Sequence, residues 1–374
     1  MKVGILGTGQ LALMMAQANQ GLGLEIIPFG GKGGKFLSSV CAPVEGDLND
    51  QTAVDAFIDS VDVVTYESEN TPVDSLIKNA EKIAPTLDAL KLFQNRLLEK
   101  NFLVEQGLKT VNYQLLSTPE ELDEAATTIG FPAILKTVTE GYDGRGQCLV
   151  KSLDELKAGF DELNQYCIME GFVDFDQEIS IVAVRDKQKN IAFYPVAENF
   201  HRSGQLRLSI VDGEHPLQKK AEDAIRNLLE KLDYVGCMAM EFFVKGDQLL
   251  VNEMAPRVHN SGHWTMDGAD QSQFYLHIKA VAGQAISTPV ISQPVAMVNC
   301  IGDMPADTAK YDRLDFVSVY DYGKEPRAER KVGHINVLGN DQSKAEFFNT
   351  LAAMLDEANE TSLADLMRDR ATSV

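Results

Sequence analysis

The chain has few cysteines, and none of them is spaced for metal binding or redox chemistry. Five cysteines are scattered over 374 residues, with no C-x-x-C motif. An odd, scattered set of this kind is typical of small buried side chains in a reducing compartment. The pattern argues against a disulfide framework and a structural zinc site, and it predicts a cytoplasmic protein.

Basic residues and long apolar runs are also scarce. The 55 acidic residues outnumber the 34 basic ones, which gives a formal net charge of -21. Such a field repels phosphate backbones and anionic lipids, so we expect neither nucleic acid nor a membrane as a partner. No stretch has the length and apolar character of a transmembrane helix. Any phosphate group must therefore be bound by a local cluster of basic side chains and backbone N–H groups.

The pattern of apolar residues predicts an α/β protein of two or three domains. Strands alternate with helices in the first ninety or so residues, which favours a parallel, doubly wound sheet there. The predicted strands are 2–6, 24–28 and 61–66, and the predicted helices are 10–19, 52–60 and one continuous helix over 88–106.

The rest of the chain predicts mixed α and β structure. The predicted strands are 133–136, 168–170, 178–185, 191–196, a hairpin of 238–244 and 248–252, and then 295–300, 316–320 and 333–338. The predicted helices are 120–129, 153–163, 216–232 and a terminal helix over 344–357.

A glycine motif follows the first predicted strand. Gly7-Thr-Gly9-Gln-Leu-Ala12 fits the G-x-G-x-x-G/A pattern that binds pyrophosphate at a helix N-terminus. A dinucleotide site also needs an acidic residue near the end of the second strand, and this chain has Phe29-Gly-Gly-Lys there. Three interpretations stay open, with dinucleotide binding the least favoured: a turn shaped by glycine, a site for a simpler phosphate, and a dinucleotide site.

A second glycine-rich segment lies shortly after a lysine on a predicted strand. Lys136 precedes the segment 141–147, Gly-Tyr-Asp-Gly-Arg-Gly-Gln, which is not a Walker A loop. Glycine lets the backbone approach an anion closely, because it has no side chain and tolerates positive φ. Lys136 favours a phosphate-binding loop over a simple hairpin tip.

Two glutamates lie on opposite arms of the predicted hairpin. A three-residue loop centred on Asp247 would place Glu241 directly opposite Glu253, whereas a two-residue loop would place Asn252 opposite Glu241. Adjacent carboxylates repel each other unless a cation lies between them. We therefore predict that Glu241 and Glu253 hold Mg²⁺ together with nucleotide phosphates.

Two further polar segments follow the hairpin. The segment 257–263, Arg-Val-His-Asn-Ser-Gly-His, lacks a third and a fourth zinc ligand, so we interpret it as a substrate-binding loop. Lys324, Arg327, Arg330 and Lys331 form a basic cluster. In an acidic protein such a cluster is either an ion-paired surface or an anion site, and these residues alone favour neither.

Taken together, these motifs resemble the ATP-grasp superfamily, and within it the N5-carboxyaminoimidazole ribonucleotide synthetase family. The segments that carry the resemblance are Lys136, 141–147, 240–244, 252–257 and 259–263, with 9–11, 66–70 and 330–334 in addition. The Tyr-Asp-Gly-Arg-Gly-Gln and His-Asn-Ser-Gly-His motifs are the specific ones. The resemblance spans nearly the whole chain.

The resemblance implies three domains and a reaction. The three domains are a Rossmann-like domain over 1–95, an ATP-grasp domain over 96–290 with a lid at about 133–185, and a small β-rich domain over 291–374. The expected reaction is the ATP- and bicarbonate-dependent carboxylation of 5-aminoimidazole ribonucleotide, through carboxyphosphate, in purine biosynthesis. The expected cofactors are ATP and Mg²⁺, and the expected assembly is a homodimer.

The resemblance also implies roles for individual residues. ATP would contact Arg96, Lys136, Gly141, Tyr142, Asp143, Gly144, Arg145, Gly146, Gln147, Glu170, Gly171, Phe172, Val173, Glu178, His201, Asn252 and Glu253. The implied catalytic residues are Tyr142, Asp143, Arg145 and Arg257. The ribonucleotide would contact His259, Asn260 and Ser261, and its 5′-phosphate would contact Lys324, Arg330 and Lys331. Glu241 and Glu253 would be the metal ligands.

Two alternatives differ from this interpretation. One is an ATP-grasp ligase with another acceptor, such as a formate- or glycine-using purine enzyme, against which the segment 259–263 argues. The other is an NAD(P)-dependent or non-catalytic nucleotide-binding protein built on the segment 7–12, against which the missing acidic residue argues.

Overall fold

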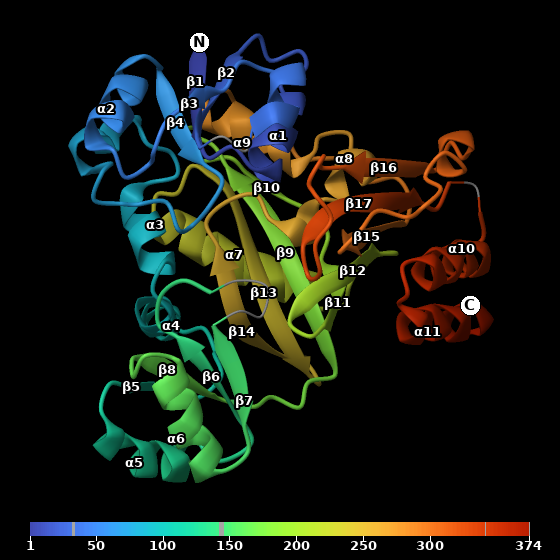
Figure 1. The fold of residues 1–374 in the computed structure, drawn as a ribbon. Coiled ribbons are helices and arrows are strands. Elements are labelled where there is room, and N and C mark those ends of the chain that lie inside the picture. Colours follow the sequence, from blue (N-terminus) through green and yellow to red (C-terminus); the bar gives the residue numbers. More distant parts are fainter. Residues whose placement is uncertain (32–33, 142–145, 341, 374) are drawn as a thin grey trace.

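The computed structural model describes residues 1–31, 34–141, 146–340 and 342–373. Figure 1 shows an N-terminal sheet at one end of the molecule, a small sheet at the other end and a large sheet between them. Among the described residues, no helix is both long and apolar enough to cross a membrane.

The N-terminal sheet is parallel and has the strand order β3-β2-β1-β4. Its strands and the first two helices are β1 (Lys2–Leu6), α1 (Gln10–Gln17), β2 (Glu25–Gly30), β3 (Val44–Glu45), α2 (Gln51–Asp59) and β4 (Val63–Tyr66). Met14 of α1 and Phe57 of α2 belong to different apolar clusters, so the two helices pack in different parts of the core. The predicted doubly wound arrangement is confirmed.

The helix predicted over 88–106 is two helices, and this prediction was wrong. The chain forms α3 (Leu87–Phe93) and α4 (Arg96–Glu105), which are separated at Gln94 and Asn95. The Asn95 side chain accepts hydrogen bonds from the N–H groups of Leu97 and Leu98, and thereby caps the start of α4. An asparagine cap offers the backbone an alternative to continued helix. The break places Arg96 in the first turn of α4.

The small sheet has the order β5-β8-β6-β7, and all its pairings are antiparallel. Its elements are β5 (Tyr113–Leu116), α5 (Leu122–Thr128), β6 (Ala133–Thr137), β7 (Gln147–Val150), α6 (Leu153–Glu162) and β8 (Cys167–Gly171). Both helices lie on one side of it (Figure 1), where Leu122 and Phe160 join its apolar cluster. The predicted lid region overlaps this sheet, although β5 and β7 were not predicted.

The large sheet has nine strands. Its main path is β14-β13-β9-β11-β12-β15-β17-β16, and β10 pairs with β9. The strands are β9 (Gln177–Arg185), β10 (Ile191–Phe193), β11 (Ala197–Arg202), β12 (Gln205–Val211), β13 (Gly236–Lys245), β14 (Gln248–Ala255), β15 (Val295–Ile301), β16 (Val317–Asp321) and β17 (Lys331–Leu338). Because β15 pairs with β12, the C-terminal strands extend the central sheet.

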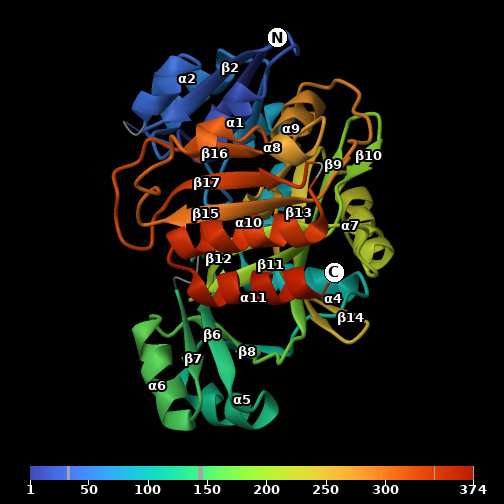
Figure 2. The same cartoon turned by 90° about the vertical axis from the view of Figure 1, so that its right-hand side faces the viewer.

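The remaining helices flank the large sheet. They are α7 (Gln218–Lys231), α8 (Thr265–Gly268), α9 (Gln273–Val281), α10 (Lys344–Glu357) and α11 (Thr361–Thr372). Figure 2 shows α10 and α11 side by side over the C-terminal strands, where Phe347 and Met367 pack with Val298 and Ile335. The helix predicted over 344–357 is confirmed as α10, but it is not the terminal helix, because α11 follows it and was not predicted.

Candidate active site

Two adjoining cavities bring most of the predicted residues together. The first has a volume of ≈ 560 Å³ and lies between the N-terminal sheet, α3 and α4, the end of β14 and the C-terminal basic cluster. The second has a volume of ≈ 410 Å³ and is lined from both the small and the large sheet. Both cavities are lined by Arg96, Lys136, Glu170, Asn252, Glu253, His259, Asn260 and Lys331. A group bound in one cavity is therefore next to a group bound in the other.

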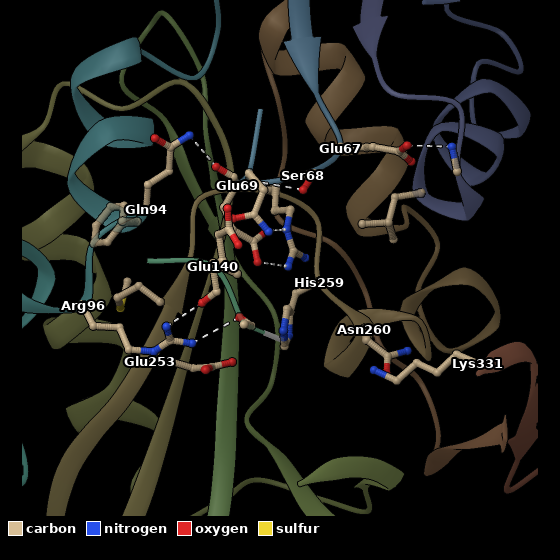
Figure 3. A pocket seen from close by; sticks show the side chains of 18 of the residues that line it. Glu67, Ser68, Glu69, Gln94, Arg96, Glu140, Glu253, His259, Asn260 and Lys331 are labelled. Atoms are coloured by element: carbon tan, nitrogen blue, oxygen red, sulfur yellow. Dashed lines mark hydrogen bonds and ion pairs between the residues drawn. The ribbon is translucent and has the colours of Figure 1, made fainter. Parts of the chain in front are cut away.

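Arg96 is held at the base of the second glycine-rich segment. Its Nη1 donates to the carbonyls of Thr137 and Glu140 at 2.8 and 2.6 Å, and its Nη2 donates to the carbonyl of Gly141 at 3.1 Å (Figure 3). The guanidinium thus ties the first turn of α4 to the chain that leaves β6. The predicted phosphate ligand also orders the start of the glycine-rich segment.

Lys136 takes part in a buried charge cluster with one residue that the sequence analysis missed. Its Nζ lies 2.8 Å from Glu170 Oε2, and Lys100 Nζ lies 3.0 Å from Glu170 Oε1. Glu170 thus forms an ion pair with each of the two lysines. Burial alone would raise the pKa of Glu170, but the charges of Lys136 and Lys100 lower it to about 2.

Apolar side chains around the second cavity form a slot that suits a flat base. Phe172, Val173 and Phe175 line it together with Phe243. The rings of Phe175 and Phe243 are stacked, with their centroids 4.8 Å apart. Because the Glu170 side chain is engaged by two lysines, a base in this slot would meet the backbone of the segment 170–173 and not the Glu170 carboxylate.

Glu178 and His201 face each other at the other side of the second cavity. His201 Nδ1 forms an ion pair with Glu178 Oε2. Burial would lower the pKa of His201, but the bond to Glu178 and the nearby glutamates raise it overall. The pair offers a carboxylate and an imidazole ring beside the base slot, where both residues were predicted to contact ATP.

The predicted metal ligands lie directly opposite each other. Glu241 on β13 pairs with Glu253 on β14, although the loop has only the two residues Gly246 and Asp247 between the paired Lys245 and Gln248. A β-bulge at Asn252 shifts the register by one residue and restores the pairing that a two-residue loop would otherwise remove. Glu241 and Glu253 therefore face each other without the three-residue loop that the sequence analysis expected for this pairing.

The donors of this hairpin fit Mg²⁺. Burial and the charge of Glu253 raise the pKa of Glu241, as expected for two carboxylates held side by side. Two carboxylates and the Asn252 amide are oxygen donors of the kind that Mg²⁺ prefers. The described residues contain no cluster of three or more His, Cys, Asp or Glu able to hold a metal, so phosphates and water would complete the coordination.

Arg257 is fixed by a glutamate that the sequence analysis did not assign. Its Nη2 donates to Glu69 Oε1 at 3.0 Å, and its Nε donates to Glu69 Oε2. Burial would raise the pKa of Glu69, but the guanidinium lowers it to about 2. Glu69 follows β4 and Arg257 follows β14, so this bidentate pair joins the N-terminal sheet to the large sheet beside the first cavity.

The segment after Arg257 turns its polar side chains in different directions. His259 and Asn260 line both cavities, whereas Ser261 is fully buried and lines neither. Ser261 Oγ lies 2.9 Å from His259 Nδ1 and orients that ring. Burial and the charge of Arg257 lower the pKa of His259 well below its ordinary value, so its imidazole is neutral near pH 7. His263, which was not assigned a role, also lines the first cavity.

The C-terminal basic cluster lines the first cavity. Lys324, Arg327, Arg330 and Lys331 all reach it, and Lys331 reaches the second cavity as well. Lys324 Nζ donates to Gln10 Oε1 at 2.6 Å, which connects the cluster to the start of α1. Four cations around one cavity of a strongly acidic protein favour an anion site over an ion-paired surface.

The first glycine motif is occupied by the protein's own carboxylate. Glu67 accepts hydrogen bonds from the N–H groups of Gly9 and Ala12 at 2.6 and 2.9 Å. Those are the groups that would bind pyrophosphate in a dinucleotide site. Gly7 has φ +125°, and a Cβ there would lie 2.3 Å from Glu67. The motif therefore packs against Glu67, which argues against the dinucleotide alternative.

Part of the second glycine-rich segment lies outside the described residues. Tyr142, Asp143, Gly144 and Arg145 belong to that part, so their predicted roles stay predictions. The flanking glycines are described, and Gly141 and Gly146 have φ values of 77° and 68°. Those conformations explain the glycines at both positions.

Comparisons with known protein families cover most of the chain. The ATP-grasp domain family matches residues 101–274. The ribonucleotide synthetase preATP-grasp domain matches residues 1–94, and the phosphoribosylaminoimidazole carboxylase C-terminal domain matches residues 295–346.

Individual relatives agree with these matches. The chain is 38% identical over 346 residues to N5-carboxyaminoimidazole ribonucleotide synthase of Pseudomonas aeruginosa, covering 92% of this chain and 96% of the relative. The crystal structure of the synthetase from Thermus thermophilus has a TM-score of 0.88 and 39% identity, and covers 95% of this chain and 98% of that one. The Aspergillus clavatus synthase in complex with ADP and 5-aminoimidazole ribonucleotide has a TM-score of 0.86 and 27% identity, and covers 96% and 98%.

Proposed function

The chain belongs to the N5-carboxyaminoimidazole ribonucleotide synthase family of ATP-grasp ligases, and on that premise we propose that its two cavities hold the two substrates of one reaction. The enzyme uses ATP and Mg²⁺ to convert 5-aminoimidazole ribonucleotide into its N5-carboxylated form in purine biosynthesis. The second cavity would bind ATP, and the first would bind the ribonucleotide and bicarbonate. The observation that carries this assignment is the set of residues that line both cavities, Lys136 and Glu253 among them.

ATP would lie with its base in the slot of Phe172, Phe175 and Phe243. Its ribose would meet Glu178, and its phosphates would extend towards Lys136 and Arg96. When bound at Glu241 and Glu253, Mg²⁺ would supply neutralisation of phosphate charge. This orientation would bring the γ-phosphate to the boundary between the cavities.

Bicarbonate would attack the γ-phosphorus through one oxygen, release ADP and form carboxyphosphate. The exocyclic amine of the ribonucleotide would then attack the carboxyl carbon of carboxyphosphate and displace phosphate, or it would attack CO₂ that carboxyphosphate has released together with phosphate. Phosphoryl transfer depends mainly on positioning and charge neutralisation, so the cationic lining contributes directly. His259 lines both cavities, so its ring would contact the ribonucleotide beside the reacting groups.

The ribonucleotide would be oriented by charges at both ends of the first cavity. Lys324, Arg330 and Lys331 would bind the 5′-phosphate. Arg257, held by Glu69, and the amide of Asn260 would lie towards the reacting end. The predicted catalytic residues Tyr142, Asp143 and Arg145 lie outside the described residues, and their catalytic role stays a proposal. A guanidinium fixed by a carboxylate loses little side-chain freedom when it binds substrate.

The domain limits 1–95, 96–290 and 291–374, the lid, the homodimer and the cytoplasmic location remain proposals. The family matches over 1–94, 101–274 and 295–346 support a division into three domains. Size-exclusion chromatography with light scattering would test the dimer.

The function is tested by phosphate release from ATP in the presence of Mg²⁺ and bicarbonate, with and without 5-aminoimidazole ribonucleotide. We expect strong stimulation by the ribonucleotide. ATP hydrolysis that does not respond to the ribonucleotide would mean that the acceptor is wrong. Absence of both ATP binding and turnover would refute the assignment of the second cavity.

A further inference from the structure

Lys100 is a buried lysine to which the proposed reaction assigns no role. Its side chain is 3% exposed, and that of Glu170 is 4% exposed, whereas that of Lys136 is 13% exposed and lines both cavities. Lys100 lines the first cavity but not the second. Of the two lysines on Glu170, only Lys136 is thus placed to meet a phosphate that enters from the nucleotide cavity.

The charges of this cluster are unequal, since one carboxylate faces two ammonium groups. A buried carboxylate that loses its counter-charge is strongly destabilising, because neither water nor another cation replaces it. With Lys136 as its sole partner, Glu170 would compete with the nucleotide phosphates for that ammonium group. With Lys100 3.0 Å away on its other oxygen, Glu170 keeps a counter-charge when Lys136 turns to a phosphate.

The fold holds Lys100 in this place independently of the nucleotide. Lys100 lies four residues after Arg96 on α4, so both side chains project from one face of that helix. The guanidinium of Arg96 is bound to the backbone that leaves β6, and the ammonium of Lys100 faces Glu170 on β8. The Lys100 ammonium also lies 5.9 Å from the centre of the Tyr113 ring on β5.

We propose that Lys100 is a positioning residue for ATP binding, because it neutralises Glu170 and so leaves Lys136 available to the nucleotide phosphates. This inference rests on the proposed nucleotide cavity and goes beyond it, since Lys100 itself does not touch ATP. Glu170 then orients Lys136, and Lys100 weakens the ion pair between Glu170 and Lys136.

The proposal makes an unusual prediction about a double variant. In Lys100→Met the Glu170 carboxylate retains Lys136, so the bond between Lys136 and the nucleotide phosphate is lost. ATP binding should therefore weaken about 10- to 100-fold, the range for loss of a hydrogen bond to a charged group. In Lys100→Met/Glu170→Gln the competing charge is gone as well, and ATP affinity should return to within about threefold of wild type. Lys136→Met should weaken ATP binding in both backgrounds, because the phosphate ligand itself is missing.

The experiment is calorimetric titration of the full chain with ATP and Mg²⁺, with the melting temperature of each variant measured alongside. Lys219→Met, at an exposed position on α7, is the matched control and should bind ATP like wild type. Because Glu170 keeps Lys136 in Lys100→Met, the proposal expects this variant to lose ATP affinity while its melting temperature stays within a few degrees of wild type.

Several outcomes would overturn the proposal. They are unchanged ATP affinity in Lys100→Met, affinity that Glu170→Gln does not restore, and a parallel fall of affinity and melting temperature that indicates a purely structural role. A rise in KM for the ribonucleotide with unchanged ATP affinity would instead make Lys100 a substrate ligand. If wild type itself does not bind ATP, the assignment of the nucleotide cavity fails, and this result is distinct from all of the others.

Discussion

Glu170 and the Glu241–Glu253 pair are carboxylate sites on the lining of the same cavity, and their charges are balanced in opposite ways. Glu170 has two lysines within 3.0 Å, and its pKa is lowered to about 2. Glu241 faces another glutamate, and burial together with that charge raises its pKa. The protein thus pairs Glu170 with its own lysines, whereas the Glu241–Glu253 pair is the one that we propose is balanced by Mg²⁺.

The largest effect is expected when the unbalanced pair loses a metal ligand. Glu253→Gln removes one anionic oxygen donor and should lower kcat/KM by about 100- to 1000-fold, because metal neutralisation of phosphate charge contributes several kcal/mol. The rate of ribonucleotide-stimulated phosphate release measures this fall in kcat/KM. Glu230→Gln, at an exposed position on α7, is the control. Unchanged activity and Mg²⁺ dependence in Glu253→Gln would remove this residue from the metal site.

Substitution at Glu170, the site with two lysines, should change the free energy of unfolding. Glu170→Gln leaves two nearly enclosed lysines without their carboxylate and should lower the free energy of unfolding by about 3 kcal/mol. Urea denaturation at neutral pH measures this change. An unchanged unfolding midpoint would mean that the ion pairs contribute nothing to the fold.

The two sites should also respond oppositely to pH. The pKa of Glu170 is lowered from 4.5 to about 2, so its contribution is present above pH 4.5 and is lost as the pH falls towards 2. Over this window, wild type should lose about 3 kcal/mol more of its free energy of unfolding than Glu170→Gln does. Acid unfolding of both proteins, followed by circular dichroism, tests the sign. Parallel pH curves would contradict the lowered pKa.

The smallest effect is expected at Glu241 without metal. Its raised pKa means that its contribution to stability is present below pH 4.5 and is lost as the pH rises through the raised value. Glu241→Gln should therefore be up to about 1 kcal/mol more stable than wild type at pH 8 with EDTA, and no more stable at low pH. Thermal unfolding with EDTA measures this difference. A destabilised variant at pH 8 would show that a cation is not needed to relieve the pair.

Local patterns in the sequence predicted much of the fold and several of the residues that line the two cavities. The strand over 2–6 and the helix over 344–357 have the predicted bounds, because apolar periodicity within one element reports its own burial. The continuous helix over 88–106 failed, because the Asn95 cap was overlooked, although an asparagine within a helical pattern was available as a signal.

The opposition of Glu241 and Glu253 was predicted for a different reason from the one observed. Counting residues around the two-residue turn places Asn252 opposite Glu241, and only the bulge at Asn252 corrects the register. A bulge is selected by the packing of neighbouring strands, so the hairpin sequence alone does not specify it. The same applies to Lys100. The sequence shows its spacing from Arg96, but only the structure shows that it pairs with Glu170 on β8.

The sequence by itself determined the kind of elements, the lysine and glutamates that suit a nucleotide with Mg²⁺, and the family resemblance, because these depend on residues close together in the chain. Tertiary structure alone decided that Glu67 fills the first glycine motif, 58 residues from Gly9, and that Glu69 holds Arg257 across 188 residues. The first contact joins the ends of β1 and β4, which are neighbours in one sheet, and the second joins the N-terminal sheet to the large sheet. Their partners are chosen by the summed packing of whole elements, which no local pattern contains.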